Sequence, residues 1–243
     1  LIFAEGPFDF KLKELTIQFF KSGILDEKDL VQYEEIKKKV KLDSVPATFV
    51  FKNTLEYRGV LVIRGIKEKL SGYVTNTDPA YTKHGLLGVA KETGTFENIV
   101  EYCKPANDCP DSQAAYRSAL LVNEFTLKSC EVLDQSEINK NRIQKGYLPA
   151  NLVLLRDAGD CLPKLPSIKT KFKKNFGCFV EMPTEEGIAL LTGMEIVPIP
   201  PPTKDLKKDY TLRANMTIKH MKNYDGLYIH IKGPDVPGHD GDA

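Results

Sequence analysis

The apolar positions in the first 150 residues predict three helices. Asp26 can cap a helix with one face that carries the apolar residues Leu30, Tyr33, Ile36 and Val40. Asp111 or Ser112 can cap the longest predicted helix, 112–135, and a shorter helix follows Ser136. The first twenty residues have no clean period and predict no element.

The segment between these helices predicts a hairpin followed by long loops. Residues 47–52 and 57–64 are rich in β-branched and aromatic side chains, and the short connection NTLE joins them. Two such runs predict a β-hairpin. Residues 65–111 are rich in Gly, Pro, Asn, Asp and Thr, which is typical of functional or irregular loops, with room for one more strand.

After residue 150 the pattern changes to an alternation of strands and helices. Helical segments starting near Ser167, Thr184 and Asp209 separate four strand-like runs, at 152–156, 177–182, 194–199 and 226–232. This alternation is typical of a parallel sheet covered on both faces. The sequence therefore predicts an α/β fold in which an α+β part precedes an α/β layer with mostly parallel strands.

Composition and charge exclude several classes of protein. The 243 residues include 34 basic and 33 acidic side chains, a net charge of +1. So balanced a chain has no general attraction to nucleic acid or to anionic membranes. The longest uncharged run, 146–155, is half of the ~20 residues of a membrane-spanning helix. No signal peptide is recognisable, and five cysteines without a CxxC pair predict reduced thiols in the cytoplasm.

The last residues carry the densest group of potential metal ligands. Asp235 and His239 follow the predicted strand 226–232, and ligands bind at the carboxyl ends of strands in open α/β sheets. Carboxylate and imidazole together suit a dication such as Mn²⁺ or Zn²⁺. A solvated Asp/Gly turn is the alternative, and a complete site needs further ligands from elsewhere. His230, between two isoleucines, is predicted to pack in the core.

A second group of residues suits a small anionic substrate. Basic and amide side chains lie near predicted strand ends and loops: Arg58, Arg64, Arg142, Asn151, Arg156 and Arg213. Arginine binds phosphate and carboxylate through two parallel hydrogen bonds, although each of these arginines can equally be a surface residue. Arg156 is the best placed, because it ends an apolar run and precedes DAGD. Asp78 lies in the turn TNTDP, which an Asx-turn explains as well as a functional role does.

Several motifs in the chain resemble one enzyme family. The segment HIKGPDVPGHDGD resembles the KGPDxxGHDGD segment of the archaeal-type cofactor-independent phosphoglycerate mutases, in the alkaline phosphatase superfamily. Further blocks follow the family's order: YRGVLVIRG, TNTDPAY, LLVNEFTLKSCEVLD, NKNRIQKGYLPANLVLLRDAGD, LPKL, GCFVEMPTEEGIALLTGME and DYTLRAN. Together they cover roughly residues 57–243.

This resemblance implies a reaction and a set of site residues. The reaction is the interconversion of 3-phosphoglycerate and 2-phosphoglycerate in glycolysis and gluconeogenesis, through a phosphoserine and with two divalent metals. Mn²⁺ is the first choice, with Zn²⁺, Co²⁺ or Mg²⁺ as alternatives. Asp235 and His239 would bind one metal. The residues implied to bind substrate are Arg58, Asp78, Asn151, Arg156, Arg213 and Lys232.

The resemblance also implies that the chain is part of a longer enzyme. It begins with Leu1 rather than Met, and the family's nucleophilic serine lies upstream, whereas its Asp-His pair and final histidine lie downstream. Residues 1–200 would form an inserted substrate-side (cap) domain, and 201–243 the returning part of an alkaline-phosphatase-like α/β core, inactive alone. Two alternatives stay open: a phosphatase or phosphopentomutase-like enzyme of the same superfamily, and a non-catalytic binding module that keeps the cap fold.

Overall fold

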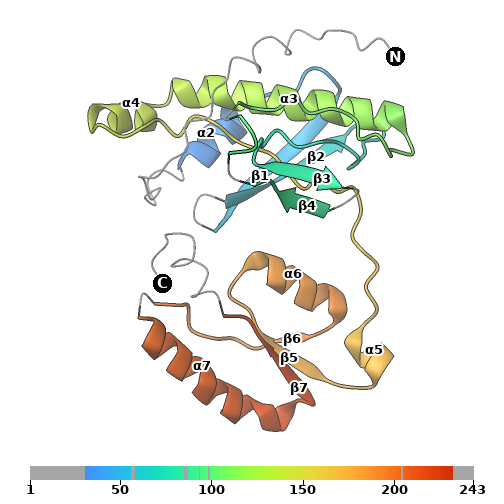
Figure 1. The fold of residues 1–243 in the computed structure, drawn as a ribbon, viewed down its shortest axis with the longest axis vertical. Helices are drawn as coiled ribbons and strands as arrows, with labels where there is room; N and C mark the ends of the chain where they lie inside the picture. Colours follow the sequence, from blue (N-terminus) through green and yellow to red (C-terminus); the bar gives the residue numbers. More distant parts are fainter. Residues whose placement is uncertain are drawn as a thin grey trace. The chain divides into compact units, whose positions relative to one another are not determined.

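The computed structural model describes residues 31–231 apart from 56–57, 85–86, 93, 98 and 204 (Figure 1). The chain forms two compact units that divide between Leu162 and Pro163. The predicted helix residues Asp26 and Leu30 and the predicted site residues Lys232, Asp235 and His239 lie outside the described part. The assignment of residues 1–200 to an inserted domain and of 201–243 to a returning core stays a prediction.

The first unit contains the predicted helices and hairpin. Its elements are α2 (Val31–Lys39), β1 (Ala47–Leu55), β2 (Arg58–Gly65), β3 (Tyr81–His84), β4 (Leu87–Ala90), α3 (Ser112–Asp134) and α4 (Glu137–Gln144). β1 pairs antiparallel with β2, and β3 pairs antiparallel with β4. The predicted helices and the first hairpin are confirmed. The loop-rich residues 65–111 hold a complete second hairpin, one strand more than predicted.

An aromatic core joins α3 to the first hairpin. Phe125 of α3 is fully buried and meets Phe49 and Phe51 of β1 edge to face, with 5.3 Å between ring centroids in both pairs. Tyr33 of α2 stacks on Phe51 at 4.6 Å, and Ile36 completes the cluster. The apolar face predicted for α2 is therefore the face that packs, because it meets the inward side chains of β1.

Side-chain caps fix where the helices α3 and α4 begin. Asp111 accepts a hydrogen bond from the Ala114 backbone N–H at 2.9 Å and caps α3. Ser136 accepts from the Ile138 backbone N–H at 3.3 Å and caps α4. Each cap satisfies a backbone donor that the first helical turn leaves without a partner.

Replacing Asp111 by alanine is expected to lower the free energy of unfolding by about 1 kcal/mol, because the Ala114 N–H loses its acceptor. Asp111→Asn is the matched control, since the asparagine oxygen can accept the same hydrogen bond. Urea unfolding of the full-length protein, followed by circular dichroism, measures both variants. If the alanine variant is as stable as the asparagine variant, the cap contributes nothing.

The strand predicted at 152–156 is wrong. This segment is extended but belongs to no sheet, because its backbone partners lie in a loop. The Thr77 N–H donates to the Leu155 carbonyl, and the Leu155 N–H donates to Thr77 Oγ1, both at 2.8 Å. Alternate side chains face two apolar clusters: Val153 and Leu155 face the Phe125 cluster, and Leu152 and Leu154 face Val100. Burial on both sides explains the continuous apolar run.

The second unit is a small parallel α/β layer, as predicted. It comprises α5 (Ile168–Phe172), β5 (Phe176–Phe179), α6 (Pro183–Thr192), β6 (Glu195–Ile196), α7 (Leu206–His220), the 3₁₀ turn η2 (Met221–Asn223) and β7 (Gly226–Ile229). The sheet order is β6-β5-β7, and β5 is parallel to both neighbours. Figure 1 shows α6 and α7 on opposite sides of the strands, as right-handed crossovers in opposite directions require.

The described residues therefore form a mixed α/β fold with a parallel sheet. Within them, no helix has both the length and the apolar surface that crossing a membrane would require.

Candidate functional site

Two of the predicted substrate residues, Asp78 and Arg156, lie together in the first unit. Arg156 Nη1 is 4.0 Å from Asp78 Oδ2, and Arg156 Nε is 3.5 Å from Asp157 Oδ2. Both distances exceed the ~2.8 Å of a charge-assisted hydrogen bond. The guanidinium carbon lies 3.7 Å from the centroid of the Tyr81 ring. The Arg156 side chain is 39% exposed, so its N–H groups can reach a ligand.

Buried polar residues of the loop before β3 hold Asp78 beside Arg156. Thr77, which is fully buried, bonds the backbone of Leu155 through both its own N–H and its hydroxyl. Asn76 Oδ1 accepts from the Asp157 N–H at 3.2 Å. Because buried polar groups need partners, these bonds fix the loop against residues 155–157. The loop and the arginine are distant in sequence, and the bonds of Asn76 and Thr77 bring them together.

Asp78 forms the Asx-turn that its sequence context predicts and also faces Arg156, whereas its role in substrate binding stays a prediction. Its Oδ1 accepts from the Ala80 N–H at 3.0 Å, which is the Asx-turn alternative. Its other oxygen, Oδ2, is the one that faces Arg156. The turn therefore orients the carboxylate, and the carboxylate restrains the guanidinium.

The two aspartates of the DAGD sequence after Arg156 make further contacts with neighbouring loops. Asp157 has a φ of 60°, and its Oδ1 comes so near to Gly88 that a Cβ there would lie 1.9 Å from the oxygen. A larger residue at position 88 would therefore have to displace the Asp157 carboxylate. Asp160 Oδ2 accepts from the Gly72 N–H at 2.9 Å and from the Ser71 hydroxyl at 3.2 Å. The Gly72 bond, against the effect of burial, lowers the pKa of Asp160.

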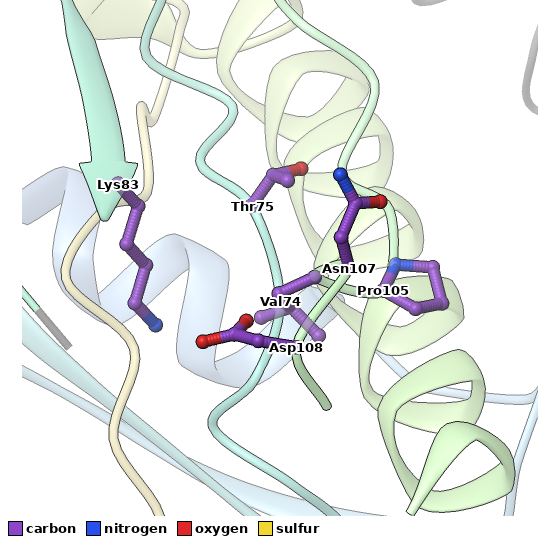
Figure 2. A pocket seen from close by; sticks show the side chains of 7 residues that line it. Val74, Thr75, Lys83, Pro105, Asn107 and Asp108 are labelled. Atoms are coloured by element: carbon purple, nitrogen blue, oxygen red, sulfur yellow. The ribbon is translucent and has the colours of Figure 1, made fainter. Parts of the chain in front are cut away.

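A pocket of about 270 Å³ beside β3 is lined by a lysine whose amine already donates hydrogen bonds to backbone carbonyls. Its lining residues are Val74, Thr75, Lys83, Pro105, Ala106, Asn107 and Asp108. Lys83 Nζ donates to the carbonyls of Gly72 and Ala158 at 2.6 and 2.7 Å. Burial lowers the pKa of Lys83, and nearby carboxylates, Asp157 foremost, oppose the shift. Figure 2 shows Asp108 directed toward the amine. Lys83 therefore serves to hold the loops together.

Asn151 and Arg58, two other predicted substrate residues, lie elsewhere in the first unit. Asn151 Nδ2 donates to Asp134 Oδ1 at the end of α3, at 2.5 Å. Arg58 begins β2, where its carbonyl accepts from Asn53 Nδ2 at 3.0 Å. Their roles in substrate binding stay predictions.

Arg213, which lies on α7 in the second unit, is 2% exposed and engaged within that unit. It forms an ion pair with Glu181, and its Nη1 donates to the Asp209 carbonyl at 3.2 Å. A buried ion pair of this kind orients α7 against the end of β5, because neither charge can be left without its partner. These bonds do not test the predicted contact of Arg213 with substrate, which stays a prediction.

The metal site predicted at Asp235 and His239 lies outside the described residues. Within residues 31–231, with the gaps given above, no three His, Cys, Asp or Glu side chains are arranged to hold a metal ion. His230 follows β7, and its N–H donates to the Phe179 carbonyl at 2.9 Å. Its Nε2 is 3.6 Å from Glu185 Oε1, and its side chain is partly buried, close to the packed position predicted for it.

Tyr81 and Asp157 are neighbours of Arg156 that the sequence patterns above do not single out. Tyr81 follows the TNTDP turn at the start of the alternating run YTKH, and Asp157 immediately follows the arginine. An aromatic residue next to a turn that is already suspected of a functional role is a usable signal, since rings often cover guanidinium groups. The positive φ of Asp157 has no signal in the sequence.

Comparisons with known proteins identify related chains. A family model described as 2,3-bisphosphoglycerate-independent phosphoglycerate mutase matches residues 13–139. The protein of that name from Aeropyrum pernix is 36% identical over 204 residues, which are 83% of this chain and 47% of the relative. The one from Ignicoccus hospitalis is 32% identical over 193 residues, 79% of this chain and 42% of the relative. The chain thus spans less than half the length of these relatives.

One solved structure shows a similar fold. The PH0037 protein from Pyrococcus horikoshii aligns with a TM-score of 0.51 and 17% sequence identity, over 93% of this chain and 48% of that chain. At this identity the likeness concerns the fold alone.

Proposed function

This chain belongs to the 2,3-bisphosphoglycerate-independent phosphoglycerate mutase family, and from that membership we propose that it supplies the substrate side of an enzyme that interconverts 3-phosphoglycerate and 2-phosphoglycerate. The parent enzyme is an isomerase, and this part of it is inactive alone. The observation that supports this role is the group of residues around Arg156, called the Arg156 cluster, which comprises Arg156, Asp78, Asp157 and Tyr81. In it, a partly exposed guanidinium is held by Asp78 and Tyr81.

The chemistry of the Arg156 cluster suits the proposed substrate. Phosphoglycerate has a carboxylate and a phosphate, and both accept hydrogen bonds from the planar fork of an arginine. The contacts of Arg156 with Asp78 and Asp157, at 4.0 and 3.5 Å, are long enough for an anionic group to replace them. Substrate binding then exchanges two weak ion pairs for charge-assisted hydrogen bonds.

Other functional residues of the proposed enzyme lie outside the described part. Asp235 and His239 are the proposed ligands of one of two divalent metals, with Mn²⁺ as first choice. Such metals neutralise a transferring phosphoryl group and favour ionisation of a serine nucleophile. β7 of the parallel sheet β6-β5-β7 precedes these residues in the chain. Residues 1–200 would close over that core and shield the phosphoryl group from water.

The test uses the full-length protein with 3-phosphoglycerate and Mn²⁺ and without added bisphosphoglycerate, and follows the formation of 2-phosphoglycerate with enolase. We expect steady conversion and no comparable turnover of ribose 5-phosphate. Preferred turnover of sugar phosphates would indicate the phosphopentomutase-like alternative. A protein with no turnover, no bound metal and no change of stability in Mn²⁺ would indicate the non-catalytic binding module.

A further inference from the structure

The Tyr81 ring is placed against Arg156 by a strand rather than by a free loop. Tyr81 is the first residue of β3 and pairs with Ala90 of β4. Its carbonyl also accepts from Asn76 Nδ2 at 3.3 Å, and Asn76 is itself buried. The ring therefore has a fixed base from which it covers one face of the guanidinium, 3.7 Å from the guanidinium carbon.

The ring restrains Arg156 in a way that the two carboxylates cannot. Asp78 and Asp157 attract the guanidinium, but their charges also repel an anionic ligand. An aromatic face attracts a cation through its quadrupole and carries no net charge. Because the ring covers the face of the guanidinium, the N–H groups in the guanidinium plane stay available. Among the residues that the structure describes, Nη2 of Arg156 has no hydrogen-bond acceptor.

We propose that Tyr81 is a positioning residue: its ring sets the plane of the Arg156 guanidinium so that the N–H groups face the phosphate or carboxylate of the substrate. This inference rests on the proposed function, because it assigns the ligand of Arg156. Without the ring, the arginine side chain samples many rotamers, and ordering them on each binding event weakens the affinity for substrate.

The kinetic test compares Tyr81→Leu with Tyr81→Phe in the full-length enzyme. The leucine variant is expected to raise KM for 3-phosphoglycerate about tenfold, whereas phenylalanine, which keeps the aromatic face, stays within about twofold of wild type. Because the ring orders Arg156 for substrate binding and takes no part in the chemical step, kcat should fall by a smaller factor than KM rises. A leucine variant with the KM of the wild type would overturn the proposal, as would a phenylalanine variant as impaired as leucine.

A second measurement does not depend on activity. The Nε–H group of Arg156, assigned by its loss in Arg156→Lys, is followed by ¹⁵N NMR in the full-length protein. We expect an ordered signal in wild type and in Tyr81→Phe, and an averaged, faster-exchanging signal in Tyr81→Leu. Tyr81→Met replaces the leucine variant if that variant unfolds. An unchanged signal in leucine or methionine contradicts the role of Tyr81, whereas absent mutase turnover in wild type contradicts only the proposed function.

Discussion

Replacing Arg156 by alanine in the full-length enzyme is expected to lower kcat/KM for 3-phosphoglycerate by about a hundredfold to a thousandfold, because the variant loses charge-assisted hydrogen bonds to an anionic group. Arg156→Lys keeps the charge without the planar fork and should fall between wild type and alanine. Release of inorganic phosphate should rise relative to mutase turnover in the alanine variant, because a poorly held glycerate lets water compete for the phosphoryl group.

The control for Arg156→Ala is Arg117→Ala, which removes another arginine of the same unit. Arg117 lies on α3, and its Nε donates to the Lys69 carbonyl at 3.1 Å. This variant is expected to keep kcat/KM within about twofold of wild type, as most surface substitutions do. If Arg156→Ala leaves mutase kinetics unchanged as well, Arg156 does not contact the substrate.

Glu124→Gln is expected to lower the free energy of unfolding by about 3 kcal/mol, because it removes a buried charge on which several donors converge. The Glu124 carboxylate accepts from the backbone N–H groups of Asp43 and Ser44 at 2.7 and 3.1 Å and from the Ser44 hydroxyl at 2.6 Å. It also pairs with Lys128 at 2.8 Å. Glutamine keeps the size of the side chain but points an amide donor at these donors.

The stability contributed by Glu124 depends on pH with a defined sign. Burial opposes its charge, but the hydrogen bonds from Lys128, Ser44 and the Asp43 backbone outweigh burial and lower its pKa. A group whose pKa is lower in the folded state stabilises the fold above its unfolded pKa and loses that contribution as the pH falls through the folded pKa. The stability difference between wild type and Glu124→Gln should therefore shrink below about pH 4.3.

Urea unfolding at pH 7 and at pH 3 measures this difference, and amide hydrogen exchange at Asp43 and Ser44 locates it. Ser44→Ala is the matched control, since it removes one of the donors and leaves the charge, and it should cost only about 1 kcal/mol. A glutamine variant as stable as wild type at pH 7 would show that the carboxylate does not hold residues 43–44.

Local signals predicted most elements of this fold, and long-range pairing explains the exceptions. Asp111 and Ser136 cap the helices that follow them, because a cap depends only on nearby residues. The run 152–156 has the composition of a buried strand, yet the backbone of Leu155 bonds to the N–H and the hydroxyl of Thr77 in a loop. No local pattern distinguishes a strand in a ladder from an extended segment held by a loop.

The same division applies to the candidate site. Arg156 was identifiable from its position after an apolar run, and Asp78 from its turn. Their neighbourhood depends on Asn76 and Thr77, buried polar residues whose bonds form only when the loop meets residues 155–157. Arg213, in a sequence block that resembles a family motif, bonds within its own unit, and its predicted contact with substrate stays a prediction.

Arg156, held by Asp78 and Tyr81, is proposed to bind the substrate in the complete enzyme. A crystal structure of the full-length protein with 3-phosphoglycerate and Mn²⁺ tests it most directly. We predict a phosphate or carboxylate oxygen within hydrogen-bonding distance of the Arg156 guanidinium, which still lies on the Tyr81 ring. A substrate bound elsewhere, with Arg156 still paired to Asp78 and Asp157, would contradict this account.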